Sequence, residues 1–444
     1  MTGCTFCHLP RGWHYILNGI MGGCVADALG VPVEFQNRET LRGNPVINMR
    51  SYGTHNQKAG TWSDDTSMTL CLLDSLSKGL DYKDIMDKFL KWINDAEYTA
   101  HGEVFDVGNA TRKALRRFED GESPLNCGGL SENDNGNGSL MRILPILFYI
   151  KANYGAEFTQ SDEAMNIIHQ VSALTHGHKR SLIACGIYIS VASMLLEGRD
   201  LSEAVEMGIY NAMEYYERHD EFQVELHNYN RLNDKSFAEI PINNIKSSGY
   251  VVDTIEAAIW CLLNTKSYKD CALLAVNLGE DTDTVAAVAG GLAGLYYGYD
   301  DIPKEWLSVI AKREYIEGLC KELGIALGKE EAQKLCSYIP HFETATKDRV
   351  CKWGGGEMLA EKNENIKTAH EILKRVSKNK EARMAYEARQ AEIMDQLTRE
   401  NSARKEGMQE GIEKVAKSLL DVLDYETISA KTGLSVEFVK GLRK

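Results

Sequence analysis

The stretch that decides the fold of this chain is DTDTVAAVAGGLAG, which runs from Asp281 to Gly294. Its first four residues carry two carboxylates and two hydroxyls, and the residues that follow are apolar or very small. Each glycine costs a helix about 1 kcal/mol relative to alanine, so close packing against a neighbour has to offset that loss. The stretch therefore predicts a buried helix whose first turn carries two aspartates.

A similar cluster, Ser63-Asp64-Asp65-Thr66, precedes a second apolar helical segment. For either cluster alone, helix capping and the positive end of the helix dipole are a sufficient explanation. The two together need more, because four buried carboxylates would repel one another by several kcal/mol unless a cation lies between them. Hard oxygen ligands favour Mg²⁺, with Mn²⁺ as the alternative.

Apolar residues recur at intervals of three and four along most of the chain, with no convincing run of strands. The sequence therefore predicts an all-α protein. The polar, glycine-rich segment from Gly128 to Gly138 is unsuited to a core helix, so we expect a loop that approaches a ligand closely. Representative predicted helices cover residues 68–76, 82–93, 164–174, 181–196 and 254–263.

The chain has 444 residues, a formal net charge of -14 and a sequence pI near 5.4. This length allows one large domain with an appendage, and the negative charge disfavours broad adhesion to nucleic acids or anionic membranes. The apolar stretch 285–297, which we take as the longest, is too short to span a bilayer. The sequence therefore predicts a cytoplasmic protein with no membrane partner, whose cysteines are mostly buried free thiols.

Composition changes near Gly354, where three glycines precede a long charged stretch. We assign residues 1–350 to the main helical domain, 357–412 to a charged helical linker or short coiled coil, and 413–444 to a segment that resembles a helix-turn-helix. We expect this C-terminal helical extension to mediate self-association or another protein contact. Nucleic-acid contact through its lysines is the weaker alternative, because charged helices are usually solvated.

Three further side chains are candidates for a functional site. Glu34 is flanked by apolar residues, so it is either a carboxyl with a raised pKa that transfers protons or a partly exposed loop glutamate. His176 is either a contact to phosphate or ribose or an ordinary structural histidine. Arg142 is either a bidentate partner of a diphosphate or one half of a buried ion pair.

The pattern Asp281-x-Asp283-x-Val285 also fits the signature of haloacid-dehalogenase-like phosphotransferases, in which the first aspartate is the nucleophile. That signature belongs after a buried strand, near the start of a domain of alternating strands and helices. In this chain it lies late in a helical sequence. We therefore keep a phosphatase, which would release phosphate, as a rival hypothesis only.

Taken in order, these motifs resemble the ADP-ribosylglycohydrolase family, and the resemblance runs from about Leu17 to Trp306. Each motif alone is a weak signal for this family, but the complete set in this order is a strong one. Its members are Gly22 to Gly30, Glu34, Ser63 to Thr66, Phe105 to Thr111, Gly136 to Arg142, Thr175-His176 and Asn277 to Thr284.

The resemblance implies an orthogonal helical bundle with a centre of two Mg²⁺ or Mn²⁺ ions and a cleft for ADP-ribose. Glu34, Asp64 and Asp106 match residues near the metals and the substrate to which catalytic roles are carried over. The implied substrate contacts are Asn109, Asn137, Gly138, Ser139, Met141, Arg142 and His176. The implied metal ligands are Ser63, Asp64, Asp65, Asp281, Asp283 and Thr284.

We therefore expect hydrolysis at the anomeric carbon of the distal ribose, which frees ADP-ribose from a modified protein or small molecule. Arginine and serine both remain open as the acceptor. The alternative is a catalytically silent relative that binds ADP-ribose or serves as a crystallin-like structural protein. Two departures from the family pattern stand out: Ser63, where threonine is also common, and Glu280, which adds bulk and charge where glycine is frequent.

Overall fold

The computed structural model describes residues 14–337, with side chains to residue 328. The chain divides into two compact units, Met1–Gly354 and Gly355–Lys444. The segments predicted at 357–412 and 413–444 lie outside the described residues. The coiled coil, the helix-turn-helix, the self-association and the nucleic-acid contact therefore stay predictions.

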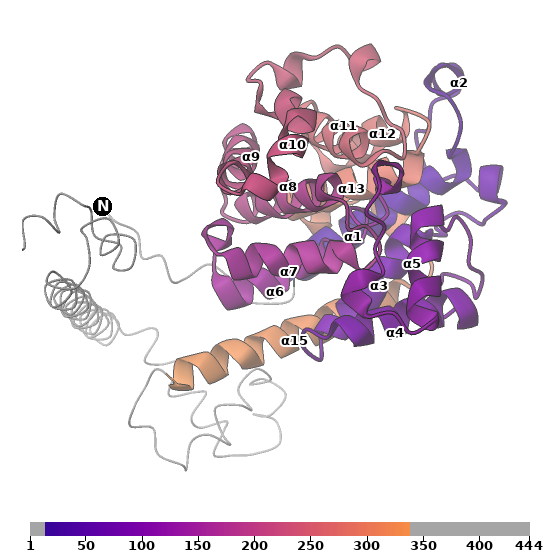
Figure 1. Ribbon diagram of the computed structural model, residues 1–444. Coiled ribbons are helices and arrows are strands. Elements are labelled where there is room, and N and C mark those ends of the chain that lie inside the picture. Colours follow the sequence, from indigo (N-terminus) through magenta and orange to yellow (C-terminus); the bar gives the residue numbers. More distant parts are fainter. Residues whose placement is uncertain (1–13, 338–444) are drawn as a thin grey trace, which may run out of the picture. The chain divides into compact units, whose positions relative to one another are not determined.

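Residues 14–337 form an all-α fold with fifteen α-helices and no strand, as predicted (Figure 1). The α-helices are α1 (His14–Gly30), α2 (Arg38–Gly43), α3 (Asp64–Leu76), α4 (Tyr82–Asp95), α5 (Asn109–Glu119), α6 (Pro145–Tyr154), α7 (Asp162–Ala173), α8 (Lys179–Leu195), α9 (Leu201–Glu217), α10 (Gln223–Leu226), α11 (Val251–Leu263), α12 (Tyr268–Val276), α13 (Thr282–Tyr297), α14 (Lys304–Leu307) and α15 (Arg313–Ser337). Short 3₁₀ helices are η1 (Val31–Val33), η2 (Gly53–His55), η3 (Pro124–Asn126), η4 (Glu132–Asp134), η5 (Phe158–Gln160), η6 (Asp220–Phe222), η7 (His227–Asn233), η8 (Phe237–Glu239), η9 (Ile242–Asn244) and η10 (Tyr299–Asp301).

The predicted helices correspond to α3, α4, α7, α8 and α11. Four of the five begin two to four residues before the predicted start, because their first turns lie outside the apolar periodicity. At α3 and α7, Ser63 and Ser161 accept hydrogen bonds from backbone N–H groups of the first turn. The glycine-rich segment 128–138 is a loop apart from the single turn η4, as expected.

The helices α1 and α13 form the central pair of the bundle (Figure 1). A Cβ added at Gly22 would lie 2.4 Å from the carbonyl oxygen of Gly290, and one at Gly294 would lie 2.2 Å from that of Asn18. A larger residue at either position would push the helices apart. The predicted close packing of this glycine-rich helix is confirmed, and α13 is buried from Thr282 to Leu295.

The other helices pack around this pair. The helices α8, α11 and α12 contact α13, α3 and α15 contact α1, and α4 lies on α3. At the end of α1, a Cβ at Gly30 would lie 2.4 Å from the Cα atom of Asp283. This contact fixes the first turn of α13 beside the segment that leads to Glu34.

One segment among residues 14–337, His14–Val33, is long and apolar enough to cross a membrane by length and composition. It comprises α1 and η1, and 89% of its most apolar window is buried inside the bundle. That burial is typical of a core helix. The sequence analysis took 285–297 as the longest apolar stretch, which was wrong because α1 continues its apolar run past the buried Asp27.

Candidate active site

The two acidic clusters meet at the first turns of α3 and α13. The hydroxyl of Thr284 donates to Asp65 Oδ2 at 3.2 Å, across 219 residues of sequence. The hydroxyl of Ser63 donates to the same oxygen at 3.2 Å. Asp64, Asp65 and Asp283 are all at most 4% exposed. The fold thus gathers the carboxylates that the sequence analysis proposed as one site.

Asp27, on α1, holds the first turn of α3 in place. Its carboxylate accepts from the backbone N–H of Ser63 at 3.0 Å, from that of Thr66 at 3.2 Å and from the Thr66 hydroxyl at 2.5 Å. The sequence analysis noted Asp27 in a motif but gave it no role. Its signal was an acidic residue within a largely apolar helix, since a carboxylate can be buried there only with hydrogen-bond partners.

Asp281 is held from two sides. Its backbone N–H donates to the carbonyl of Ser247 at 3.0 Å, and the side-chain amide of Asn137 donates to its Oδ2 at 2.9 Å. The side chain of Arg38 ties the same region together, since it donates to the carbonyls of Leu278 and Ile245 at 2.7 and 2.6 Å. Arg38 was missed from sequence because its partners lie more than 200 residues away.

Three carboxylate oxygens in this cluster have no hydrogen-bond partner among the described residues. They are Asp65 Oδ1, Asp281 Oδ1 and Asp283 Oδ2, all shielded from solvent. Burial, followed by the charges of neighbouring carboxylates, raises the pKa values of Asp65 and Asp283 well above their usual range. Unpartnered acidic oxygens at the starts of two helices are suitable ligands for a hard cation, and among these acids Asp281 and Asp283 lie, together with Glu34, within the 4.8 Å spacing of a metal site.

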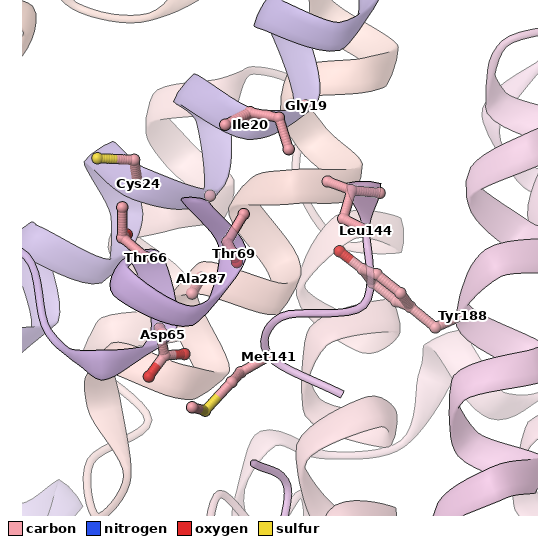
Figure 2. A pocket seen from close by; sticks show the side chains of 11 residues that line it. Gly19, Ile20, Cys24, Asp65, Thr66, Thr69, Met141, Leu144, Tyr188 and Ala287 are labelled. Atoms are coloured by element: carbon pink, nitrogen blue, oxygen red, sulfur yellow. The ribbon is translucent and has the colours of Figure 1, made fainter. Parts of the chain in front are cut away.

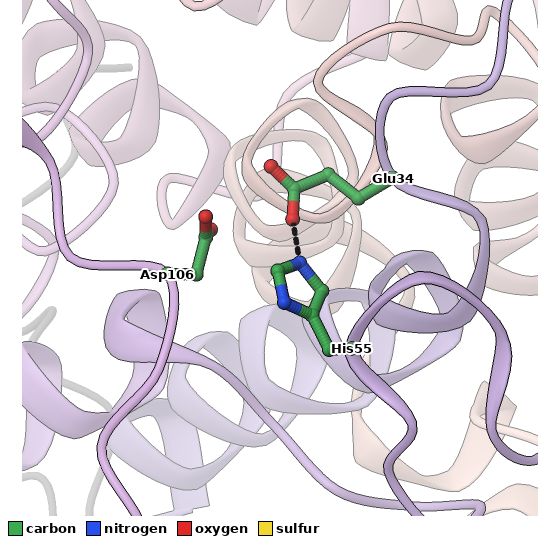
Figure 3. Close-up of side chains that lie close together, drawn as sticks. All are labelled: Glu34, His55 and Asp106. Carbon is green, nitrogen blue, oxygen red and sulfur yellow. Dashed lines mark hydrogen bonds and ion pairs between the residues drawn. The ribbon is translucent and has the colours of Figure 1, made fainter.

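Glu34, His55 and Asp106 converge on this cluster from three separate segments (Figure 3). His55 Nε2 and Glu34 Oε2 are hydrogen-bonded. One ligand atom from each of these three side chains lies within 4.8 Å of the other two. The carboxylate oxygens of Glu34, Asp281 and Asp283 likewise lie within 4.8 Å of one another. Glu34 therefore lies between the acidic cluster and His55.

The carboxyls of Glu34 and Asp106 are poised to hold protons near neutral pH. Burial, followed by the charge of Asp281, raises the pKa of Glu34 to about 8. Burial, followed by the charge of Glu34, raises the pKa of Asp106 to about 8. Glu34 is 3% exposed, so the alternative of a partly exposed loop glutamate is wrong.

Backbone strain surrounds the same carboxylates. Phe35, Asp106 and Glu280 have positive φ angles of 64°, 57° and 65°, a region that glycine adopts far more readily. Phe35 N–H donates to the Glu280 carbonyl at 2.7 Å, and Glu280 N–H donates to the Gln36 carbonyl at 2.7 Å. The left-handed backbone explains why glycine suits position 280. The side chain of Glu280 is exposed.

The predicted substrate contacts divide into residues near the acidic cluster or the surface, described first, and residues buried in the core. Asn109 is exposed at the start of α5, and Asn137 lies against Asp281. His176 is 2% exposed, and its ring leaves no space for a Cβ at Gly138, which would lie 2.9 Å from Cε1. Burial, followed by the charge of Arg142, lowers the pKa of His176 to about 3, so this imidazole is neutral.

Ser139 and Arg142 lie in the core. Ser139 is fully buried and accepts a hydrogen bond from Ser172 at 2.9 Å. The buried guanidinium of Arg142 donates to the Thr175 hydroxyl at 2.8 Å and lies 4.9 Å from the ring centroid of Phe89. Among the described residues it has no carboxylate partner within 4.0 Å. The position of Arg142 therefore fits neither a bidentate contact to a diphosphate nor a buried ion pair, because its guanidinium is buried and contacts uncharged side chains.

Met141 lines a small cavity to which Asp65 also contributes (Figure 2). The cavity has a volume of about 20 Å³, and its walls include Asp65 and Thr69 of α3 together with Tyr188 of α8. This volume suits about one water molecule. Met141 is 9% exposed and lines this cavity together with Asp65.

The sequence model of the ADP-ribosylglycohydrolase family matches residues 14–333. The chain belongs to this family. It is similar to an ADP-ribosylarginine hydrolase of Serratia proteamaculans, with 32% identity over 316 residues that cover 68% of this chain and 77% of that protein. It is also similar to the ADP-ribosyl-dinitrogen reductase glycohydrolase of Rhodospirillum rubrum, with 33% identity over 296 residues, 66% of this chain and 88% of that protein.

A solved structure described as an ADP-ribosylglycohydrolase-related protein complex has the same fold, with a TM-score of 0.58 and 31% identity. The match covers 71% of this chain and 99% of the chain in that structure. The predicted resemblance, fold and enzyme class are confirmed, and the chain is an ADP-ribosylglycohydrolase. The rival phosphatase hypothesis is wrong, since in this glycohydrolase Asp281 follows helix α12 and a turn where that signature requires a strand.

Proposed function

We propose that this glycohydrolase is Mg²⁺-dependent and removes ADP-ribose from arginine side chains. The observation that carries the metal is the set of three unpartnered buried oxygens on Asp65, Asp281 and Asp283. Similarity to an ADP-ribosylarginine hydrolase favours arginine over serine as the acceptor. The oxygen-only donor set favours Mg²⁺, with Mn²⁺ as the ion that substitutes most readily.

Two ions fit the number of acidic groups gathered here. The residues that would hold them are Ser63, Asp64, Asp65, Asp281, Asp283 and Thr284. When bound, the metal supplies positive charge that orients the ribose hydroxyls and makes water more acidic. The hydrogen bonds from Asn137 and Thr284 keep Asp281 and Asp65 turned toward the site.

The chain's own residues account for the proton movements. Hydrolysis forms a bond between a water oxygen and the anomeric carbon, breaks the bond to the acceptor nitrogen and moves a proton onto that nitrogen. Glu34 is the group we assign as proton donor, because its carboxyl group is buried beside Asp281 and Asp283 and is hydrogen-bonded to His55. Asp106 and Asp64 are the alternative proton carriers. Asn109, Asn137, Gly138, Met141 and His176 are the residues we assign to the ADP-ribose side of the site.

A cytoplasmic ADP-ribosylated protein or small molecule is the partner that fits these assignments. The seven cysteines among residues 14–328 are free thiols, all of them buried, which is usual in a reducing compartment.

The test is release of ADP-ribose from ADP-ribosyl-arginine and ADP-ribosyl-serine peptides, with Mg²⁺ and with EDTA. We expect release from the arginine peptide only, and only with metal. Asp84→Asn removes a carboxylate from the outer helix α4, away from the acidic cluster. As a control for the loss of an acidic side chain elsewhere in the fold, it should leave release unchanged. Tight binding without release would support the silent ADP-ribose-binding alternative and contradict the proposal.

A further inference from the structure

We propose that His55 is a positioning residue that fixes the Glu34 carboxyl group through its Nε2 atom, so that the loop from Tyr52 to Gln57 is part of the active site. This inference rests on the proposed function, because it assigns Glu34 the proton transfer. It begins from the hydrogen bond between His55 Nε2 and Glu34 Oε2 (Figure 3). Neither the sequence motifs nor the acidic clusters point to His55.

The His55–Glu34 contact is nearly closed to solvent. The side chain of His55 is 14% exposed and that of Glu34 is 4% exposed. A hydrogen bond to a charged or polar group in such a setting holds its partner more firmly than one at the surface, since little water competes. His55 engages Oε2, and the Glu34 carboxyl group also shares a side-chain hydrogen bond with Asp106.

The loop that carries His55 is anchored on both sides of the site. The hydroxyl of Thr54 donates to the backbone carbonyl of Glu34 at 2.7 Å. A Cβ at Gly53, whose φ is +68°, would lie 1.9 Å from the carbonyl oxygen of Pro32. On the other side, the amide of Gln57 donates to Glu103 at 3.1 Å. The loop therefore connects the segment of Glu34 with the segment that leads to Asp106.

Two aromatic rings set the orientation of the imidazole. The ring centroid of His55 lies 5.1 Å from that of Phe105 and 6.0 Å from that of Phe35. Phe105 and Phe35 are the immediate neighbours of Asp106 and Glu34 in the sequence. Each carboxyl thus has an adjacent aromatic residue that packs against the same imidazole. A general acid that is oriented by a further group is a recurring arrangement in catalysis.

The experiment compares three substitutions of His55. Gln places its amide nitrogen close to the position of Nε2, whereas Asn reaches only as far as Nδ1, and Ala removes the donor. We expect H55A and H55N to lower kcat for ADP-ribosyl-arginine by about 10- to 100-fold, with KM changed by less than about threefold. We expect H55Q to recover most of the lost kcat.

The matched control is His219→Gln, because His219 also pairs with a carboxylate, Asp162, at 3.1 Å, but lies at the end of α9. This control should leave kcat unchanged. Equal kcat values for H55Q and H55N, or full activity of H55A, would overturn the inference. If H55A does not fold, the comparison of H55Q with H55N still decides.

The contact is also tested without turnover. In ¹⁵N NMR spectra of the imidazoles, Glu34→Gln should shift the Nε2 resonance of His55 and leave that of His219 in place. No shift at His55 would contradict the contact itself. If Glu34→Gln shifts the His55 resonance but the wild-type protein releases no ADP-ribose, the contact stands and the proposed function is contradicted. The two failures are therefore distinguishable.

Discussion

Asp27 and Asp283 are both fully buried aspartates in the central helix pair, yet their surroundings differ. The carboxylate of Asp27 accepts hydrogen bonds from Ser63 and Thr66, and its pKa rises only to about 6. Asp283 Oδ2 has no partner among the described residues, and burial with nearby charges raises the pKa of Asp283 well above the usual range. The partnered carboxylate holds the fold together, while the unpartnered one is suited to a cation.

This difference teaches how to separate structural acids from functional acids in a buried cluster. Burial alone does not distinguish them, because both side chains are inaccessible to solvent. The number of carboxylate oxygens that accept a hydrogen bond does distinguish them, since an unpaired buried charge is strongly unfavourable unless it is neutralised. Loss of Asp27 should therefore affect stability, and loss of Asp283 should affect metal binding and activity.

The largest expected effect is that of Asp283→Asn. We expect kcat/KM to fall by about 1000-fold or more, which corresponds to about 4 kcal/mol of transition-state stabilisation. The metal-free variant should unfold at the same temperature as the metal-free wild type or higher, because the cost of burying an unpartnered acidic group is removed. Calorimetry in EDTA together with peptide turnover in Mg²⁺ checks both parts. A variant that keeps full turnover would contradict the metal assignment.

Asp27→Ala should have the opposite signature. Two backbone N–H groups and one hydroxyl would lose their buried acceptor, so we expect the free energy of unfolding to fall by about 3 kcal/mol. The loss should be similar with and without Mg²⁺, because Asp27 is not among the proposed ligands. Urea denaturation in both conditions measures it. Destabilisation that appears only with Mg²⁺ present would mean that Asp27 acts through the metal instead.

The stability of the metal-free protein should depend on pH. Folding raises the pKa of Glu34 from 4.5 to about 8 and that of Asp106 from 3.8 to about 8, so the folded state binds more protons between these values. The resulting stability is complete below about pH 4 and is lost as the pH rises through about 8. For one net proton the loss from pH 6 to pH 8 is about 2 kcal/mol. Thermal melts in EDTA at several pH values test this, and added Mg²⁺ should reduce the slope.

The smallest effect concerns the strained backbone beside Asp281. Glu280→Gly should stabilise the fold by about 0.5 kcal/mol, because relief of the left-handed φ exceeds the added entropy of the unfolded chain only slightly. Gly279→Ala is the matched substitution, and it should destabilise, since a Cβ there would lie 2.6 Å from the Arg38 backbone nitrogen. Melting temperatures of the two variants should therefore move in opposite directions.

Much of the fold could be predicted from sequence, because helical periodicity and glycine content are local signals. The helices α3 and α13 were recognised as helices that begin with acidic residues, and the glycine-rich stretch indicated the close packing of α13. His55 and Arg38 could not be predicted, since their roles depend on partners brought together only by the fold. Arg142 shows a second limit. The family resemblance implied that it contacts substrate, but it did not indicate that the side chain of Arg142 is buried in the core.

The measurement that tests the central claim most directly is a crystal structure of the protein grown with Mn²⁺, with the ion located by anomalous scattering. The account predicts manganese bound by the unpartnered oxygens of Asp65, Asp281 and Asp283. It also predicts that Asp27 keeps its contacts to Ser63 and Thr66. Manganese that binds elsewhere, or a cluster that closes on itself without an ion, would contradict the account.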